Sequence, residues 1–110
     1  MTQKSKTGME LIHAERERQI AEEGYTPAHD DEHNLGQLAL AAACYAAPRR
    51  IYALRVENDG DYRFFDPFPW RKDKRESSRR IDLLVKAGAL IAAEIDRLIR
   101  LRDEDESSWL

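Results

Sequence analysis

The segment from Arg79 to Arg102 constrains the fold of this chain more than any other segment does. Apolar residues recur along it at alternating spacings of three and four, and a second apolar set covers most of the remaining circumference. A helix that is apolar almost all round must lie at the centre of a fold. Because Asp82, Lys86 and Glu94 interrupt this segment, we expect each of them to need a charged partner or a ligand.

Length and composition limit the class of protein. A chain of 110 residues forms one domain with a modest core, and 42% apolar with 35% charged residues is the balance of a folded globular protein. No apolar run could span a membrane and the first residues carry no apolar signal segment, so we expect a cytoplasmic protein. The net charge of −3 argues against a generic nucleic-acid binder. Cys44 lies in an alanine-rich run, where we expect it to pack in the core.

The first helix is predicted from its end signals. Thr7 and Glu10 have the spacing of a capping box, so the helix should span residues 8–23 and stop at Gly24. Its packed face should be the partly apolar stripe formed by Met9, Ile12, Arg16 and Ile20.

A second helix is predicted over residues 32–47. Asp30 or Asp31 would be its N-cap, and Pro48 follows its last residue. Its many alanines would allow a close approach to the alanine and glycine face of the last helix, which is predicted over 79–102.

An insertion over residues 48–78 separates the second helix from the last one. Runs rich in β-branched and aromatic residues flank Asp59-Gly60, which is a hairpin signal, so the insertion is either a β-hairpin or irregular. Phe68 and Trp70 alternate with prolines and should anchor an extended path against the helices. The alternative is that one of these rings stacks on a nucleobase.

These elements predict an all-α fold, namely a small three-helix bundle with the insertion between its second and third helices. Ser77 or Ser78 should cap the last helix, and a solvated tail should follow it over 103–110. The helices have more apolar surface than three helices can cover, so we expect homo-oligomerisation to complete the bundle.

Two segments, AERERQIAEEGYTPAHDD at 14–31 and RRIDLLVKAGALIAAEIDRL at 79–98, carry a family resemblance. They resemble the entry segment and the final core helix of MazG-like all-α nucleoside triphosphate pyrophosphohydrolases of phages and bacteria. The resemblance implies a helical bundle that hydrolyses nucleotides. It also implies Mg²⁺ held by a Glu-Glu-x-x-Glu motif on the middle helix and a Glu-x-x-Asp motif on the next, where the metal would bridge phosphate oxygens and activate water.

The chain departs from that metal motif. The middle helix has no acid between Gly36 and Ala47, and Lys86 follows Asp82 by one turn, which favours an ion pair over a metal site. The remaining candidates for metal ligands are His29, Asp30, Asp31 and Asp82. They lack the spacing of a His-Glu-x-x-His motif or an EF-hand, and the two neighbouring aspartates are better explained as caps.

A second group of residues suits an anionic ligand. Arginine and lysine side chains bind phosphate, and aromatic rings stack on bases. The candidates are Tyr25, Trp70, Arg79, Arg80 and Lys86. The alternative is that Lys86 pairs with a charge on the first helix and that the basic run over 71–80 is a solvated loop.

Three functions remain open. We favour a non-catalytic helical binding protein of phage or bacterial type that takes a nucleotide-like ligand or a protein partner. One alternative is a divergent metal-dependent nucleoside triphosphate pyrophosphohydrolase, which would use Mg²⁺ and require Asp30, Asp31 and Asp82 to converge. The other is an anti-defence or accessory protein-interaction factor, whose partner surface would be the insertion and the 71–80 segment.

Overall fold

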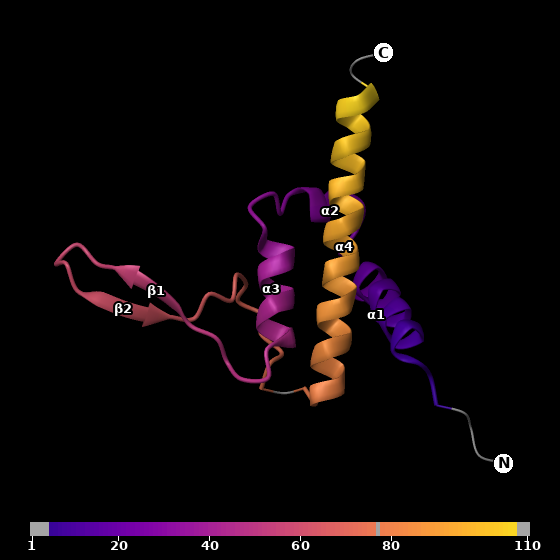
Figure 1. The fold of residues 1–110 in the computed structure, drawn as a ribbon. Coiled ribbons are helices and arrows are strands. Elements are labelled where there is room, and N and C mark those ends of the chain that lie inside the picture. Colours follow the sequence, from indigo (N-terminus) through magenta and orange to yellow (C-terminus); the bar gives the residue numbers. More distant parts are fainter. Residues whose placement is uncertain (1–4, 77, 108–110) are drawn as a thin grey trace.

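The computed structural model describes residues 5–76 and 78–107, which form four helices and one β-hairpin (Figure 1). Their order is α1 (Gly8–Glu23), α2 (Pro27–Asp31), α3 (Gln37–Ala46), β1 (Ala53–Val56), β2 (Tyr62–Phe65) and α4 (Arg80–Ser107). The predicted helical class is therefore confirmed, and the insertion contains the hairpin. Among the described residues, none of the helices combines the length and the hydrophobicity that a membrane crossing needs.

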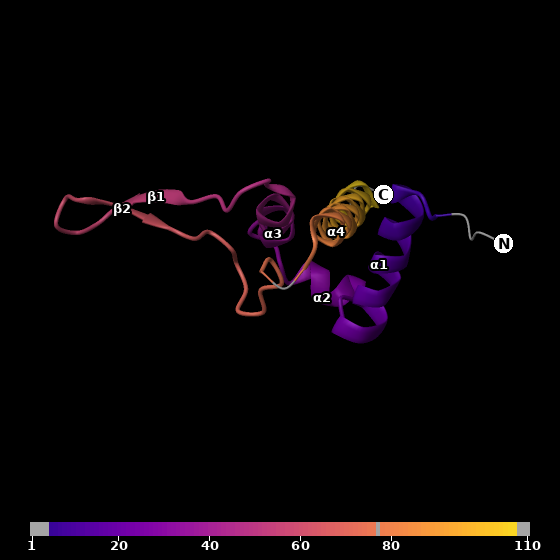
Figure 2. The same cartoon turned by 90° about the horizontal axis from the view of Figure 1, so that it is seen from below.

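The long helices form an open layer rather than the predicted bundle. α4 lies in the middle, with α3 packed on one side and α1 on the other, as the view along α4 shows (Figure 2). The structure measures 62 × 51 × 20 Å and has a radius of gyration of 17.0 Å. A compact domain of this length would have a radius of about 13 Å. Much of α4 is therefore left without a neighbour among the described residues, and the projecting hairpin adds to the extension.

The core lies between α3 and α4 and is built from small side chains, as predicted. Its buried members are Leu38, Ala41, Ala42, Tyr45, Ala87, Leu90 and Ala93. Cys44 is buried beside them, which confirms its packing role, and burial raises the pKa of its thiol. Gly88 serves a different contact, because a Cβ at this position would lie 2.6 Å from Cδ1 of Ile12 on α1.

The ends of α1 are those that the sequence predicts. Thr7 and Glu10 form the capping box, and Gly24 ends the helix with a left-handed φ of 73°. The predicted packed face is wrong in part, since Met9 is 84% exposed whereas Gln19 is 3% exposed. The buried side of α1 is polar in part: Gln19 donates a hydrogen bond to Glu15 there, whereas Ile12 makes the apolar contact with Gly88.

The second predicted helix is shorter than expected, and a separate short helix, α2, precedes it. Thr26 caps the short helix α2 with its hydroxyl, which accepts a hydrogen bond from the backbone N–H of His29, and Pro27 is its first residue. Gly36 then adopts a φ of 81°, so α3 begins only at Gln37 and not at residue 32. The predicted capping roles of Asp30 and Asp31 are therefore wrong, because both residues lie inside α2.

α4 is longer than predicted. It begins at Arg80, and the carbonyl of Arg79 accepts a hydrogen bond from the N–H of Leu83. It continues to Ser107, so residues 103–107 of the predicted solvated tail are helical, because no glycine or proline interrupts this run. The predicted cap Ser77 and the tail residues 108–110 lie outside the described residues.

The hairpin projects from the helical layer (Figure 1). Its antiparallel register pairs Ala53 with Phe65 and Val56 with Tyr62, and Gly60 in the connecting turn has a φ of 85°. The chain returns along an extended path whose Phe68 and Trp70 rings pack against the core, as predicted.

Candidate functional site: a polar and aromatic cleft

A cleft opens between α1, the first half of α4 and the extended segment that follows the hairpin. Charged and amide side chains line it, namely Glu15, Arg18, Gln19, Glu23, Lys72, Lys74 and Lys86, together with the rings of Tyr25, Tyr45 and Trp70. Its enclosed volume is about 30 Å³. This is room for one or two water molecules, so only a small group can enter its interior.

Arg18 holds two carboxylates of α1 at one wall of the cleft. Its Nε and Nη2 lie 2.7 and 3.0 Å from the two carboxylate oxygens of Glu15, and its Nη1 donates to Glu23 at 3.2 Å. The helical spacing of these residues places them on one side of α1. Burial opposes ionisation of Glu15, but the hydrogen bonds from Arg18 and the charge of Lys86 outweigh it and lower the pKa of this carboxyl. Glu15 and Glu23 therefore both stay ionised, and the charge of Arg18 already neutralises them in part.

Two lysines approach the same wall from other elements. Nζ of Lys72 lies 2.6 Å from Glu23, and this hydrogen bond is the main cause that lowers the pKa of Glu23. Nζ of Lys86 lies 3.6 Å from Glu15, so the two form an ion pair, as the alternative prediction of a partner on the first helix has it. This distance is too long for a hydrogen bond. Since four cations and two carboxylates line the cleft, positive charge is in excess there.

Two buried polar atoms of the lining have no partner within the described part of the chain. Gln19 donates from Nε2 to Glu15 at 3.2 Å, but its Oε1 accepts no hydrogen bond, and Nε1 of Trp70 is likewise unpaired. An unsatisfied buried polar group costs about 1–3 kcal/mol. A molecule in the cleft that offers a donor and an acceptor could remove this cost.

A continuous cluster of rings extends from the cleft along α2 and α3. Tyr25 stacks on His29 at 5.1 Å between ring centroids, and Trp70 lies 6.0 Å from Tyr25 and 5.5 Å from His33. Burial raises the pKa of Tyr45, on the other side of the cluster, to about 12. The rings thus give the cleft a rigid apolar edge beside its charged wall.

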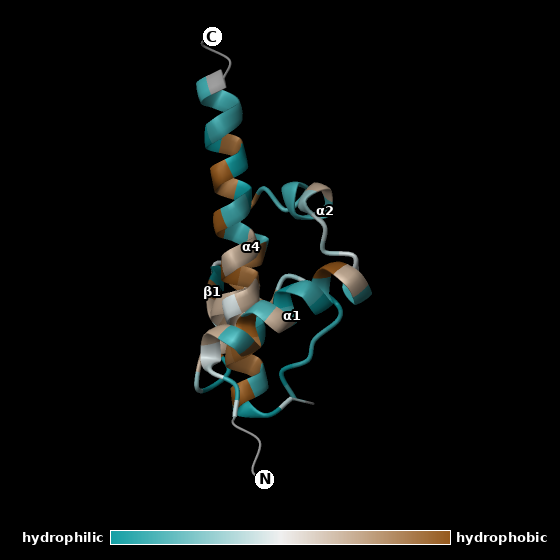
Figure 3. Ribbon diagram, turned by 90° about the vertical axis from the view of Figure 1, so that its right-hand side faces the viewer, coloured by the Kyte–Doolittle hydropathy of each residue, from teal (hydrophilic) through white to brown (hydrophobic). Residues whose placement is uncertain are grey.

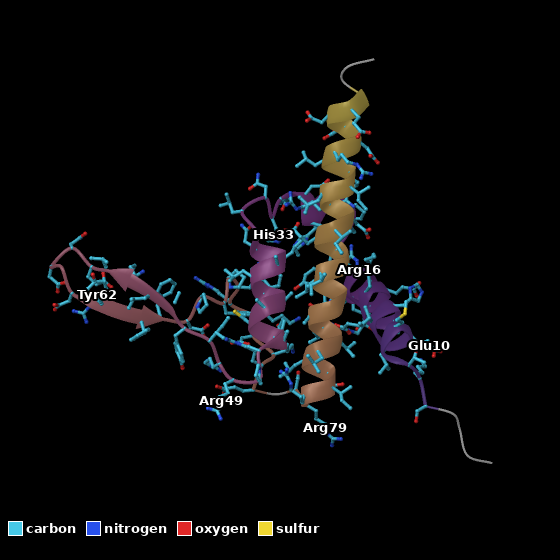
Figure 4. All side chains as sticks on the ribbon, viewed as in Figure 1. Glu10, Arg16, His33, Arg49, Tyr62 and Arg79 are labelled. Carbon is cyan, nitrogen blue, oxygen red and sulfur yellow. The ribbon has the colours of Figure 1, made fainter. Side chains whose placement is uncertain are left out.

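The structure brings together three of the five residues that were predicted to bind a ligand. Tyr25, Trp70 and Lys86 all line the cleft. Arg79 does not, because it lies immediately before the first turn of α4, at the far end of the layer from His33 (Figure 4). Arg80 does not line it either.

Arg80 has a structural role instead. Its guanidinium donates to the carbonyl of Ala47 at 2.9 Å and to the carbonyls of Tyr45 and Ala46. These are carbonyls at the C-terminus of α3, which have no partner within that helix. The structure thus shows Arg80 as a cap of α3, and its ligand role stays a prediction.

The predicted metal ligands are dispersed. Asp30 pairs with Arg16, Asp31 pairs with Arg100, and Asp82 is exposed on the first turn of α4. Because Arg100 follows Asp82 by about five turns, Asp31 lies roughly 27 Å along α4 from Asp82. Nδ1 of His29 lies 3.7 Å from Asp30, and no cluster of three or more His, Cys, Asp or Glu side chains within residues 5–76 and 78–107 could hold a metal ion.

The sequence reasoning missed the polar wall of α1. Glu15, Gln19 and Glu23 recur at a spacing of four and therefore share one helix face, with Arg18 beside them. We assigned the packed face to an apolar stripe, whereas the side of α1 that is turned inward combines Ile12 and Arg16 of that stripe with the buried Gln19. The four-residue spacing was the available signal.

Comparison of the chain with protein-family models, with curated proteins and with solved structures gives no match. The resemblance to MazG-like hydrolases therefore stays a prediction. The geometry of the cleft and of the exposed surfaces is the basis on which a function can be argued.

Proposed function

We propose that this chain is a non-catalytic binding protein for an anionic, nucleotide-like ligand, which it takes at the cleft between α1, α4 and the segment around Trp70. The observation that carries the proposal is the combination, in one cleft, of excess positive charge with the unpaired Gln19 Oε1 and Trp70 Nε1. Buried polar groups without partners are uncommon in folded proteins, so two of them in a single lining support a ligand or ordered water there.

The two lysines suit a phosphate group. Arg18 already satisfies Glu15 and Glu23, so an anion that takes Lys72 and Lys86 leaves neither carboxylate unpaired. Lys72 is 60% exposed, and such surface ion pairs are weak enough to exchange partners. Because the enclosed volume is small, the phosphate would lie at the mouth of the cleft, with the base against the rings of Tyr25 and Trp70.

The alternative of a metal-dependent hydrolase has less support. It required Asp30, Asp31 and Asp82 to converge, and their ion pairs and positions keep them apart. The non-catalytic proposal rests on this separation, together with the absence of acids from the sequence between Gly36 and Ala47.

Ligand binding can be tested by thermal shift and calorimetry at low ionic strength, with inorganic phosphate, nucleoside mono- and triphosphates and a nucleoside without phosphate. We expect the nucleotides to raise the melting temperature, and the substitution Lys86→Ala to remove this shift. Lys6→Ala is the matched control, because Lys6 is exposed and does not line the cleft. A shift that survives Lys86→Ala and Lys72→Ala would contradict the site, and pyrophosphate release in the presence of Mg²⁺ would contradict the non-catalytic assignment.

A protein partner is a second candidate, supported by the hairpin. Leu54 lies opposite Phe64, and Val56 lies opposite Tyr62, so these four side chains share one face of the hairpin. They are between 54% and 76% exposed. An apolar face on a projecting hairpin is typical of an interaction surface, and a phage accessory protein could use it on a host protein.

The hairpin proposal can be tested by crosslinking the purified chain to proteins of a bacterial lysate. We expect a discrete partner that is lost with Phe64→Lys and kept with Arg63→Lys, because the second position belongs to the opposite face of the same strand. Equal capture by both variants would contradict the assignment of the face.

A further inference from the structure

One side of α4 carries an apolar seam that no other part of the described chain covers. Its side chains are 44–66% exposed, and they belong to Ile81, Leu84, Ile91, Ile95 and Leu98. Figure 3, which is coloured by hydropathy, shows apolar segments on α4 beside α1 and again further toward the C-terminal end of α4. The seam therefore extends over much of the length of α4.

The spacing of the seam is that of a coiled coil. Ile81, Gly88 and Ile95 follow each other at seven residues, as do Leu84, Ile91 and Leu98. Together they give the alternating three and four of a heptad pattern, which favours the packing of a second helix along the seam. At Gly88 the space is taken by Ile12 of α1, so the seam consists of a short part before this glycine and a longer part after it.

We propose that two copies of this chain form a homodimer in which the α4 helices pack against each other through this seam, in antiparallel orientation. The surface is separate from the proposed ligand cleft, whose α4 residues Lys86 and Leu90 lie on another side of the helix. The inference therefore does not depend on the proposed ligand.

Charge along α4 favours one orientation of the second copy. Residues 79–93 carry three cations and one anion, whereas residues 94–107 carry six anions and three cations. In the antiparallel pairing with Ile81 opposite Leu98, the acidic run 103–106 of each copy extends past the start of the partner's α4 and lies far from the same run of the other copy. Parallel pairing would align the acidic run 103–106 with its own copy, which is unfavourable.

The open layer of helices leaves one side of α4 accessible to a second copy of the chain. A two-fold axis would put the short part of the seam, at Ile81 and Leu84, opposite the longer part of the partner, at Ile95 and Leu98. Each copy thereby supplies the apolar surface that the other one lacks, and α1 and α3 stay on the sides of α4 where they already pack.

The oligomeric state is the first test, by sedimentation equilibrium or light scattering on the full chain. We expect a dimer, and we expect the double substitution Ile91→Glu, Ile95→Glu to weaken association by more than about 100-fold, because it would bury unpaired charges. Leu40→Glu is the control, since Leu40 is a similarly exposed apolar residue at 39% but lies on α3. Circular dichroism of each variant verifies that the helices are kept.

Orientation is the second test. A spin label at Arg102→Cys, which continues the heptad spacing of the seam, in a Cys44→Ala background, should give an inter-label distance of more than about 30 Å in the antiparallel dimer, because the two last turns lie on opposite sides of the axis. Parallel helices would bring these labels to about 10 Å. A monomer at high concentration, or a dimer that the double substitution leaves intact, overturns the interface, and the short distance overturns the orientation.

Discussion

The guanidinium of Arg16 lies 2.7 Å from the carboxylate of Asp30, whose side chain has no exposure to solvent. The same guanidinium donates to the carbonyl of Tyr25 at 3.1 Å. One side chain of α1 therefore fixes both the turn that follows this helix and the short helix α2. An ion pair in such a setting is strongly coupled to folding, because removal of one partner leaves the other charge buried.

Arg16→Ala should lower the free energy of unfolding by about 3 kcal/mol, because Asp30 would remain buried without its counter-charge. Urea denaturation measures this change. The control is Arg102→Ala, since both partners of the Arg102–Asp103 pair are well exposed, at 64% and 59%, and their pairing contributes little. Equal effects of the two substitutions would show that Asp30 is solvated in solution.

Arg80→Ala should lower the free energy of unfolding by about 1–2 kcal/mol, because the carbonyls at the end of α3 lose a charged donor. It should leave nucleotide binding unchanged, unlike Lys86→Ala. Arg79→Ala is the matched control and should alter neither quantity. A loss of binding in Arg80→Ala, at unchanged stability, would restore the ligand role that the sequence suggested.

Gly88 and Ile12 should be energetically coupled. Gly88→Ala improves helix propensity by about 1 kcal/mol, but its Cβ would lie 2.6 Å from the Ile12 side chain, so we expect a net loss of stability. In the double variant Gly88→Ala, Ile12→Ala the overlap is absent, and the two effects should differ from additivity by about 1 kcal/mol. Additive effects in denaturant unfolding would show that α1 does not approach α4 closely at this point.

Acidification should destabilise the ring cluster through His33. Burial, and then the charge of His29, lower the pKa of His33 below its usual 6.5. The unfolded chain therefore binds this proton more readily than the folded chain, so stability is lost as the pH falls through about 6.5.

This pH effect can be measured in two ways. NMR titration should give a His33 pKa below 6.5, and denaturation between pH 7.5 and 5.5 should show a decrease in stability that is smaller in His33→Gln. A His33 pKa above 6.5 would contradict the burial of this ring against Trp70.

The elements with local signals could be predicted from the sequence. The Thr7–Glu10 capping box, Gly24 and the Asp59-Gly60 turn determine nearby backbone geometry, so α1 and the hairpin are where the sequence places them. The start of α3 was harder, because Gly36 overrides the helix propensity of the residues around it. Thr26-Pro27 was a readable helix start that we interpreted as a turn.

The site could be predicted only in part. Tyr25, Trp70 and Lys86 stood out by type, and they do gather in the cleft. The inward face of α1 could not be deduced from hydrophobicity, because Gln19 is polar and buried, and its side chain donates to Glu15 on the same helix. The four-residue spacing shows that Glu15, Gln19 and Glu23 share a face, but not that this face is turned toward Lys72 and Lys86 of other segments.

The hairpin is energetically separate from the helices. None of its residues from Ala53 to Phe65 is buried, and none belongs to the core. Its amide protons should therefore exchange with solvent well before those of α4, as a local unit that opens without the rest. A segment of this kind can accumulate substitutions, or be exchanged for another loop, while the helical layer and the cleft keep their geometry.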